Sequence, residues 1–325
     1  MVLEKELEKN LIRLLQREFP LVSRPFKVIA DKLNTKEDKI IEILREWQKE
    51  GRLRQISAIF NPSFFGHTSS LFAFKVSEEN LSNAIEVINA HPGVSHNYLR
   101  DHAYNLWFTL VVPPGKDLLG EAFELFKKSK AEDFLYLPIL RVFKIAAIFH
   151  LGEDEESLKD EEVFLNSDAR VSFNFTDRDR DFVKILQGPL PLTSEPFKEL
   201  AKNLSCKEEE IFEWLSTMKR KGALRRYAGL FKHQKLGLKK NVMVAWQVPD
   251  ERIEEIGKAL AKYPFITHCY LRKSYSHWPF NIYTMCHFKE KEKIEEVAEE
   301  INLRDYIALR TLKELKKVRL QLFYN

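Results

Sequence analysis

Two short segments of the sequence combine side chains that bind anions with side chains that move protons. They are His96-Asn97-Tyr98-Leu99-Arg100 and His268-Cys269-Tyr270-Leu271-Arg272. Because successive side chains of a strand point to opposite faces, a strand would align the His, Tyr and Arg of each segment in one row. Guanidinium groups bind carboxylates through two parallel hydrogen bonds, and imidazoles transfer protons or ligate iron. The rows predict a pocket wall, although inherited packing on a solvated sheet face would give the same pattern.

The two rows differ where they continue beyond the arginines. Alternation extends the first row to His102, whereas the second reaches Ser274, and His277 follows within a four-residue insertion. A turn must bring His277 back, so the halves cannot be chemically identical. Our candidate catalytic residues are Arg100, His102, Tyr104, Arg272 and His277, and our candidate substrate-binding residues are His96, Tyr98, Asn105, Trp107, Arg54, Arg225, Arg226, His268, Tyr270, Trp278 and Asn281.

Several binding candidates also have an ordinary structural explanation. Arg54, Arg225 and Arg226 could clamp carboxylates, or they could form surface ion pairs with glutamates, which add little stability. Trp107 and Trp278 could stack on a flat ligand or fill the core. Because Trp278 lies in the four-residue insertion, we favour stacking on a ligand over core packing for this residue.

The chain repeats itself once. Arg24-Pro25-Phe26 returns 171 residues later as Glu195-Pro196-Phe197, and the row at His96 returns 172 residues later at His268. One repeat of this length indicates a duplicated module rather than a solenoid. The expected helices are 4–18, 25–33, 40–49, 80–90 and 116–130, then 178–187, 196–204, 207–221, 250–261 and 290–300, and the expected strands of the first half are 52–60, 70–76, 94–101, 105–112 and 134–148.

These elements predict an α+β fold in tandem duplication. Three short helices with tight turns form a helix-turn-helix unit, and the strand that follows makes it a winged helix. A βαββαβ domain of ferredoxin-like order completes each half. The expected boundaries are 1–60 and 61–150 for the two domains of the first half, 151–175 for an acidic linker, and 176–232 and 233–325 for the second half.

Composition narrows the class of protein. The 325 residues carry a net charge of +4, but residues 151–170 alone carry −6, which leaves +10 for the rest. A basic remainder suits a polyanionic partner, either nucleic acid or a molecule with several carboxylates. No apolar run could span a membrane, and the N-terminus has no secretory signal, so we expect a cytoplasmic protein without membrane contact.

The remaining cysteines and histidines give weaker signals. Cys206, Cys269 and Cys286 form no CxxC pair, which argues against a disulfide framework or a zinc ribbon. Cys269 and Cys286 are expected as small core residues. His67 and His233 fall in expected turns and are interpreted as solvent-exposed.

A winged helix followed by a βαββαβ domain resembles the Lrp/AsnC family of transcription regulators. The more specific resemblance is to siroheme decarboxylases, which share that fold and often divide the two halves between separate subunits. It is carried by residues 96–109, by Arg225-Arg226-Tyr227, by residues 268–272 and by residues 277–287. Here the two subunit types are fused in one chain.

The resemblance implies an enzyme, a carboxy-lyase, that removes carbon dioxide from two acetate side chains of siroheme. The product would be 12,18-didecarboxysiroheme, for haem d1 or an alternative haem pathway. No cofactor is required, since the macrocycle can take up the carbanion charge and siroheme iron arrives with the substrate. The protein itself would supply no metal. We expect one pocket built from both halves, paired as an internal pseudo-dimer that could assemble further.

For this reaction we hypothesise roles for several of the candidates. Arg100 and Arg272 would anchor carboxylates, and His102 or Tyr104 in the first half and His277 in the second would donate protons. His96 or His268 could instead ligate the siroheme iron.

Two other functions remain open at this point. A DNA-binding regulator is the main alternative, but the second recognition helix begins with Lys207-Glu208-Glu209-Glu210, which would repel phosphate. We therefore expect no DNA binding. A haem-binding sensor would hold the macrocycle and leave its carboxylates intact.

Overall fold

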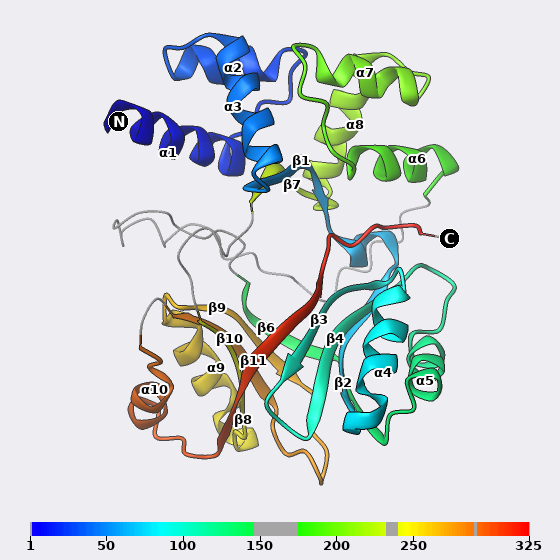
Figure 1. The fold of residues 1–325 in the computed structure, drawn as a ribbon, viewed down its shortest axis with the longest axis vertical. Coiled ribbons are helices and arrows are strands. Elements are labelled where there is room, and N and C mark those ends of the chain that lie inside the picture. Colours follow the sequence, from blue (N-terminus) through cyan, green and yellow to red (C-terminus); the bar gives the residue numbers. More distant parts are fainter. Residues whose placement is uncertain (1, 146–174, 232–239, 289–290, 325) are drawn as a thin grey trace.

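The computed structural model describes residues 2–145, 175–231, 240–288 and 291–324, arranged in two layers (Figure 1). The helix-turn-helix units of both halves form one layer, which we call the winged-helix pair, and the βαββαβ domains form the other. Both halves contain the expected order of elements, which confirms the tandem α+β fold. Apart from Phe175, the predicted acidic linker 151–175 lies outside the described residues, as does His233.

The winged-helix pair takes three helices and one strand from each half. Its elements are α1 (Val2–Arg17), α2 (Pro25–Lys32), α3 (Glu37–Lys49) and β1 (Leu53–Phe60), then α6 (Asp177–Leu186), α7 (Pro196–Asn203), α8 (Glu208–Arg220) and β7 (Leu224–Phe231). Pro25 and Pro196 open their helices, at a position where no backbone donor is needed. Gly51 and Gly222 follow α3 and α8 with φ of 66° and 75°, a left-handed conformation that favours glycine.

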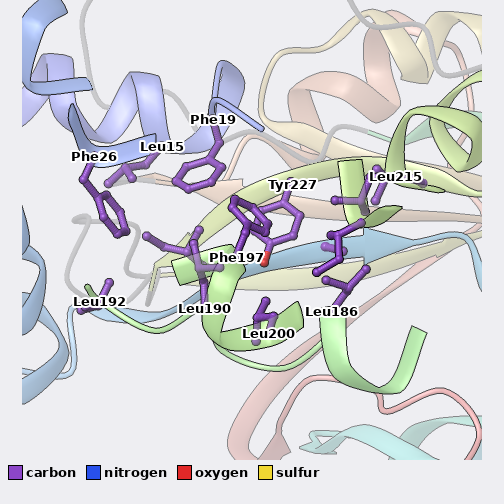
Figure 2. Close-up of a cluster of buried hydrophobic side chains, with 14 of the residues drawn as sticks. Leu15, Phe19, Phe26, Leu186, Leu190, Leu192, Phe197, Leu200, Leu215 and Tyr227 are labelled. Atoms are coloured by element: carbon purple, nitrogen blue, oxygen red, sulfur yellow. The ribbon is translucent and has the colours of Figure 1, made fainter. Parts of the chain in front are cut away.

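The two helix-turn-helix units share one ladder and one core. Strands β1 and β7 pair with each other in antiparallel order, with Ser57 opposite Ala228. A single hydrophobic cluster joins both halves around this ladder (Figure 2). In it, Phe19 of the first half stacks on Tyr227 of the second with ring centroids 5.5 Å apart. Separating the halves would expose this apolar surface to water, so the pair forms one body.

The second layer contains the remaining elements of both halves. They are η1 (Pro62–Phe65), β2 (Thr68–Lys75), α4 (Glu78–Ala90), β3 (Val94–Arg100), β4 (Tyr104–Val112), α5 (Leu118–Ser129), β5 (Asp133–Leu137) and β6 (Ile139–Ile145), then β8 (Lys240–Trp246), η4 (Asp250–Arg252), α9 (Ile253–Lys262), β9 (Ile266–Arg272), β10 (Ile282–Phe288), α10 (Ile294–Glu300) and β11 (Tyr306–Lys317).

The strands of both halves form one nine-stranded sheet with the order β5-β2-β4-β3-β11-β8-β10-β9-β6. Only Pro138 separates β5 from β6, yet these strands lie at the two ends of that order. The sheet therefore curls until its ends meet, and we call it the barrel. The prediction of one continuous strand at 134–148 is wrong, because Pro138 has no N–H to donate and divides the segment into β5 and β6.

Two long segments of the barrel exchange partners between the halves. Residues 306–310 of β11 pair with β8 of their own half, and residues 311–317 pair with β3 of the other half. In the same way β5 pairs with β2, and β6 crosses to β9. These crossings create the internal pseudo-dimer that we expected.

The barrel has apolar packing on both of its faces. Two clusters lie under the helices that cover it, and Cys269 and Cys286 are buried in one of them, as predicted. A third cluster lies between the inner faces of the two half-sheets and includes Trp107, Trp278 and Tyr283. The inner surface is therefore a filled core over part of its length.

Residues 318–324 run from the barrel to the winged-helix pair. The backbone N–H of Val318 donates to the carbonyl of Ser95 at 2.8 Å, and Leu322 exchanges two hydrogen bonds with the side chain of Gln187. His67 accepts a hydrogen bond from the backbone N–H of Phe323 at 3.2 Å and is only 4% exposed. The prediction that His67 faces solvent is wrong, because this terminal segment covers it.

Candidate active site

Both predicted rows form, at the end of the barrel next to the winged-helix pair. In β3 the ring centroids of His96 and Tyr98 lie 6.3 Å apart, and in β9 those of His268 and Tyr270 lie 5.9 Å apart. Nδ1 of each imidazole lies 2.9 Å from the hydroxyl of the preceding residue. Within the described part of the chain, Nε2 is the ring nitrogen that remains available to a ligand.

Arg100 and Arg272 end the rows inside the barrel, where they are 2% and 8% exposed. Nη1 of Arg100 donates to the carbonyl of Leu309 at 2.7 Å, and Nη1 of Arg272 donates to that of Leu137 at 2.5 Å. The Nε atoms of both have no partner, and neither guanidinium meets a carboxylate, among the described residues. Burial lowers the pKa of each arginine to about 10, so both remain charged at neutral pH. Buried cations without anions are costly, which indicates an anionic ligand.

The histidines of the rows are neutral in the free protein. Burial lowers the pKa of His96 to about 4, and the positive charges of Lys317 and Arg54 add to the effect. Burial also lowers the pKa of His268 to about 4, with further contributions from His287 and from His96 itself. Because the charge of His96 contributes to the lowered pKa of His268, the two rows lie near one another across the interior.

Arg54 and Arg225 extend the site into the winged-helix pair. Each follows the first residue of β1 or β7, has an exposed side chain, and lies near the row of its own half. Within the described ranges neither arginine has an ion pair, and Nη2 of Arg225 donates a hydrogen bond to Asn61 Oδ1 at 3.5 Å. These observations favour the carboxylate clamp over the surface ion pair for Arg54 and Arg225, while the half-buried Arg226 lies one residue further along β7.

His102 and Tyr104 do not continue the row of β3. The strand ends at Arg100, and His102 lies in the turn that joins β3 to β4. This turn is at the end of the barrel away from the winged-helix pair (Figure 1). The ring of His102 contacts Trp278, with centroids 5.3 Å apart. The hydroxyl of Tyr104 donates to Asp133 Oδ2 at 2.6 Å, and burial together with this bond raises the pKa of Tyr104. Extending the row to His102 is therefore wrong, because alternation holds only within a strand.

The insertion between β9 and β10 lies at the same far end. His277 is exposed and stacks on Tyr275. Trp278 is 2% exposed, its indole N–H donates to the hydroxyl of Tyr283 at 2.6 Å, and its ring lies 5.9 Å from that of Trp107. The structure therefore does not bring the insertion to the rows, and both tryptophans fill the inner core.

Asn105 and Asn281 serve the backbone. The side chain of Asn105 accepts from the N–H of Val76 and donates to its carbonyl, at 3.1 and 2.9 Å. The side chain of Asn281 makes the same two bonds to Val248, at 3.0 and 2.8 Å. Both asparagines hold the start of a strand against its neighbour, and their repetition reflects inherited packing.

Three cationic or titratable residues near the rows were not predicted from the sequence: His287, Arg319 and Lys317. His287 on β10 acts on His268, and burial together with Lys317 lowers its own pKa to about 4. Arg319 donates to Ser57 Oγ and to the carbonyl of Ala58 on β1, and burial lowers its pKa to about 10. Nothing in the basic run around Lys317 marks it as part of a site, since its place depends on strand pairing between the halves.

The described residues contain no group of three or more His, Cys, Asp or Glu side chains that could hold a metal ion. None of the helices in the same ranges has the length and apolar character needed to cross a bilayer. The site thus combines histidines and tyrosines with arginines that have no ion pair among the described residues, a composition suited to a large polyanion.

Two family models match the chain, each of them twice. The AsnC-like ligand binding domain matches residues 64–144 and 235–316, and the siroheme decarboxylase NirDL-like HTH domain matches residues 8–54 and 179–225. A siroheme decarboxylase of Hydrogenobacter thermophilus is 36% identical over 97% of this chain and 94% of its own length. The chain belongs to the siroheme decarboxylase family.

Other members of the siroheme decarboxylase family support the architecture. The crystal structure of the siroheme decarboxylase NirDL in complex with an iron-uroporphyrin III analogue has a TM-score of 0.75 and 32% identity, covering 98% of this chain and 95% of that one. The siroheme decarboxylase beta subunit of Methanosarcina barkeri is 37% identical over 44% of this chain and 97% of its own length. A complete subunit of that relative thus corresponds to less than half of this chain, as expected for a fusion.

Proposed function

We propose that this chain is a carboxy-lyase that decarboxylates siroheme at the junction between the barrel and the winged-helix pair. It removes carbon dioxide from the two acetate side chains on the unreduced rings and releases 12,18-didecarboxysiroheme, for haem d1 or an alternative haem pathway. The observation that carries this proposal is the pair of buried arginines, Arg100 and Arg272, which meet no carboxylate among the described residues. Free cysteines at positions 206, 269 and 286 agree with a reducing cytoplasm.

Substrate binding follows from charge. Siroheme carries carboxylates around its whole rim, and the site offers Arg54 and Arg225 from one layer and Arg100 and Arg272 from the other. Charge-assisted bonds to carboxylates are about twice as strong as bonds between neutral groups. The carboxylate that leaves must not be held in this way, since its ground state would be stabilised as much as the transition state.

Proton transfer follows from the histidines. When the bond between the acetate carbon and its carboxylate breaks, carbon dioxide departs and the electron pair remains on the methylene carbon, where the macrocycle delocalises it. Nε2–H of a protonated histidine then supplies the proton that completes the methyl group. His96 and His268 are neutral in the free protein, but a bound polyanion raises their pKa and so favours the protonated form. One of them could instead ligate the siroheme iron, which belongs to the substrate; the protein supplies no cofactor in this scheme.

The decisive experiment is a mass measurement. Purified protein incubated anaerobically with siroheme should convert it to species lighter by one and then two molecules of carbon dioxide. Intact siroheme that remains bound would instead support a haem-binding sensor. Gel shifts with DNA at low and moderate salt test the regulator function, which we expect to fail because α8 begins with three consecutive glutamates.

A further inference from the structure

The two rows are nearly equivalent, but the strands beside them are not. On β11, Lys317 lies opposite His96 and Glu314 lies opposite Tyr98. On β6, the corresponding partners of His268 and Tyr270 are Ile145 and Val142. Directly paired residues of an antiparallel ladder share a face, so each pair of side chains lies beside its row.

The wall next to the first row is charged. Lys317 Nζ lies 3.5 Å from Glu314 Oε2, and the two side chains are 21% and 32% exposed. Lys317 contributes to the low pKa of His96, and Glu314 contributes to the raised pKa of Tyr98. A carboxylate beside His96 would therefore meet an ammonium group and remain solvated.

The wall next to the second row is apolar. Val142 and Ile145 are half-buried, and they belong to none of the four hydrophobic clusters of the described residues. The arginines do not offset this difference, because each row has one from the winged-helix pair and one at its inner end. His287 lies on the second side, where burial together with Lys317 keeps its imidazole neutral. The contrast between the two sides therefore comes from the residues that pair directly with each row, on β11 and on β6.

The rate of decarboxylation should differ between the charged wall and the apolar wall. Its transition state spreads the carboxylate charge into the macrocycle, so an ammonium beside the leaving group would stabilise the ground state more than the transition state. An apolar wall excludes water from the same carboxylate and has the opposite effect.

We infer that the productive pocket is the one on the second row: the acetate that loses carbon dioxide lies against Val142 and Ile145 beside His268, and the wall with Lys317 holds a carboxylate that is retained. This inference rests on the proposed function and adds which side performs the chemistry. Each acetate occupies the apolar side in turn, so the substrate reorients between two sequential decarboxylations. His268 is the proton donor and His96 belongs to the retaining side.

Exchanging the charges tests the inference. Ile145→Lys places an ammonium in the productive pocket and should lower kcat at least about tenfold, while the affinity for an iron-uroporphyrin III analogue, measured by absorbance titration, stays the same or rises. Lys317→Met should weaken analogue binding and raise KM by about three- to tenfold, with a much smaller effect on kcat. Leu140→Lys is the matched control on β6, because Leu140 is 57% exposed and lies outside the pocket; it should keep the wild-type kcat.

Ile145→Gln guards against misfolding of the lysine variant, since it adds polarity without charge and should lower kcat by an intermediate factor. A loss of kcat in Lys317→Met with normal turnover in Ile145→Lys would overturn the inference, as would equal losses in both variants. Wild-type protein that binds the analogue but leaves siroheme intact would instead refute the proposed function. The two failures are therefore distinguishable.

Discussion

The guanidinium of Arg54 on β1 lies close enough to His96 on β3 to lower the pKa of the imidazole, although the residues belong to different layers. Arg225 on β7 has the same relationship to His268 on β9. Because β1 and β7 pair with each other, one ladder positions both arginines over both rows. In the proposed function, the winged-helix pair therefore supplies two cations to the substrate.

Neutralising these arginines should weaken substrate binding. Arg54→Met and Arg225→Met each remove one charged contact to a carboxylate, which is worth about 1.5–3 kcal/mol and corresponds to at least about a tenfold rise in KM for siroheme. Lys198→Met, on the exposed surface of α7, is the control for a general loss of positive charge. If all three variants raise KM equally, the effect is long-range attraction and the clamp is refuted.

The hydrogen bonds that Asn105 and Asn281 make to the backbone should matter for stability and not for turnover. Asn281→Leu leaves the N–H and carbonyl of Val248 without their partners in a buried position, so we expect a loss of about 2–4 kcal/mol in the free energy of unfolding. Urea denaturation measures it. At a temperature where the variant is folded, KM for siroheme should match that of the wild type, and a selective rise in KM would restore Asn281 as a substrate ligand.

Acid should destabilise the fold through its buried histidines. Burial lowers the pKa of His67 to about 4 from an ordinary value of 6.5, so between those values the unfolded chain binds the extra proton and stability rises with pH. Between pH 7 and pH 5 the loss is roughly 2 kcal/mol for His67 alone. Urea unfolding at both pH values should show a smaller pH effect in His67→Leu than in the wild type. An identical pH effect in both proteins would contradict the assignment.

The sequence predicts local features of this protein well, because they depend on local rules. Alternation within a strand places His96, Tyr98 and Arg100 in one row, and the repeat at His268 predicts a second row. The same rule fails at His102, where the strand has ended and the chain turns. Sequence spacing alone does not reveal where β3 stops.

Features that depend on pairing between the halves could not be predicted. The position of Lys317 opposite His96 follows from β11 crossing to the other half, and no local pattern encodes it. Asn105 and Asn281 show the opposite kind of error, in which a pattern is over-interpreted. Their repetition in both halves suggested shared chemistry, but it reflects shared hydrogen bonding to the backbone. Trp278 likewise occupies the core although its insertion suggested a ligand contact.

Substituting histidines at the two ends of the barrel should separate the proton donor from its competitors. General acid catalysis is worth about 100- to 10,000-fold, so His268→Gln should lower kcat at least about 100-fold while analogue binding persists. His96→Gln should mainly raise KM. His277→Gln should stay within about threefold of wild-type kcat, since His277 is exposed in the segment between β9 and β10 and lies outside the two rows. Single-turnover reactions analysed by mass spectrometry should show both decarboxylations slowed in His268→Gln, because one pocket serves both.

If His277→Gln abolishes turnover and His268→Gln does not, the proton comes from the insertion between β9 and β10, and the pocket proposed beside the second row is wrong.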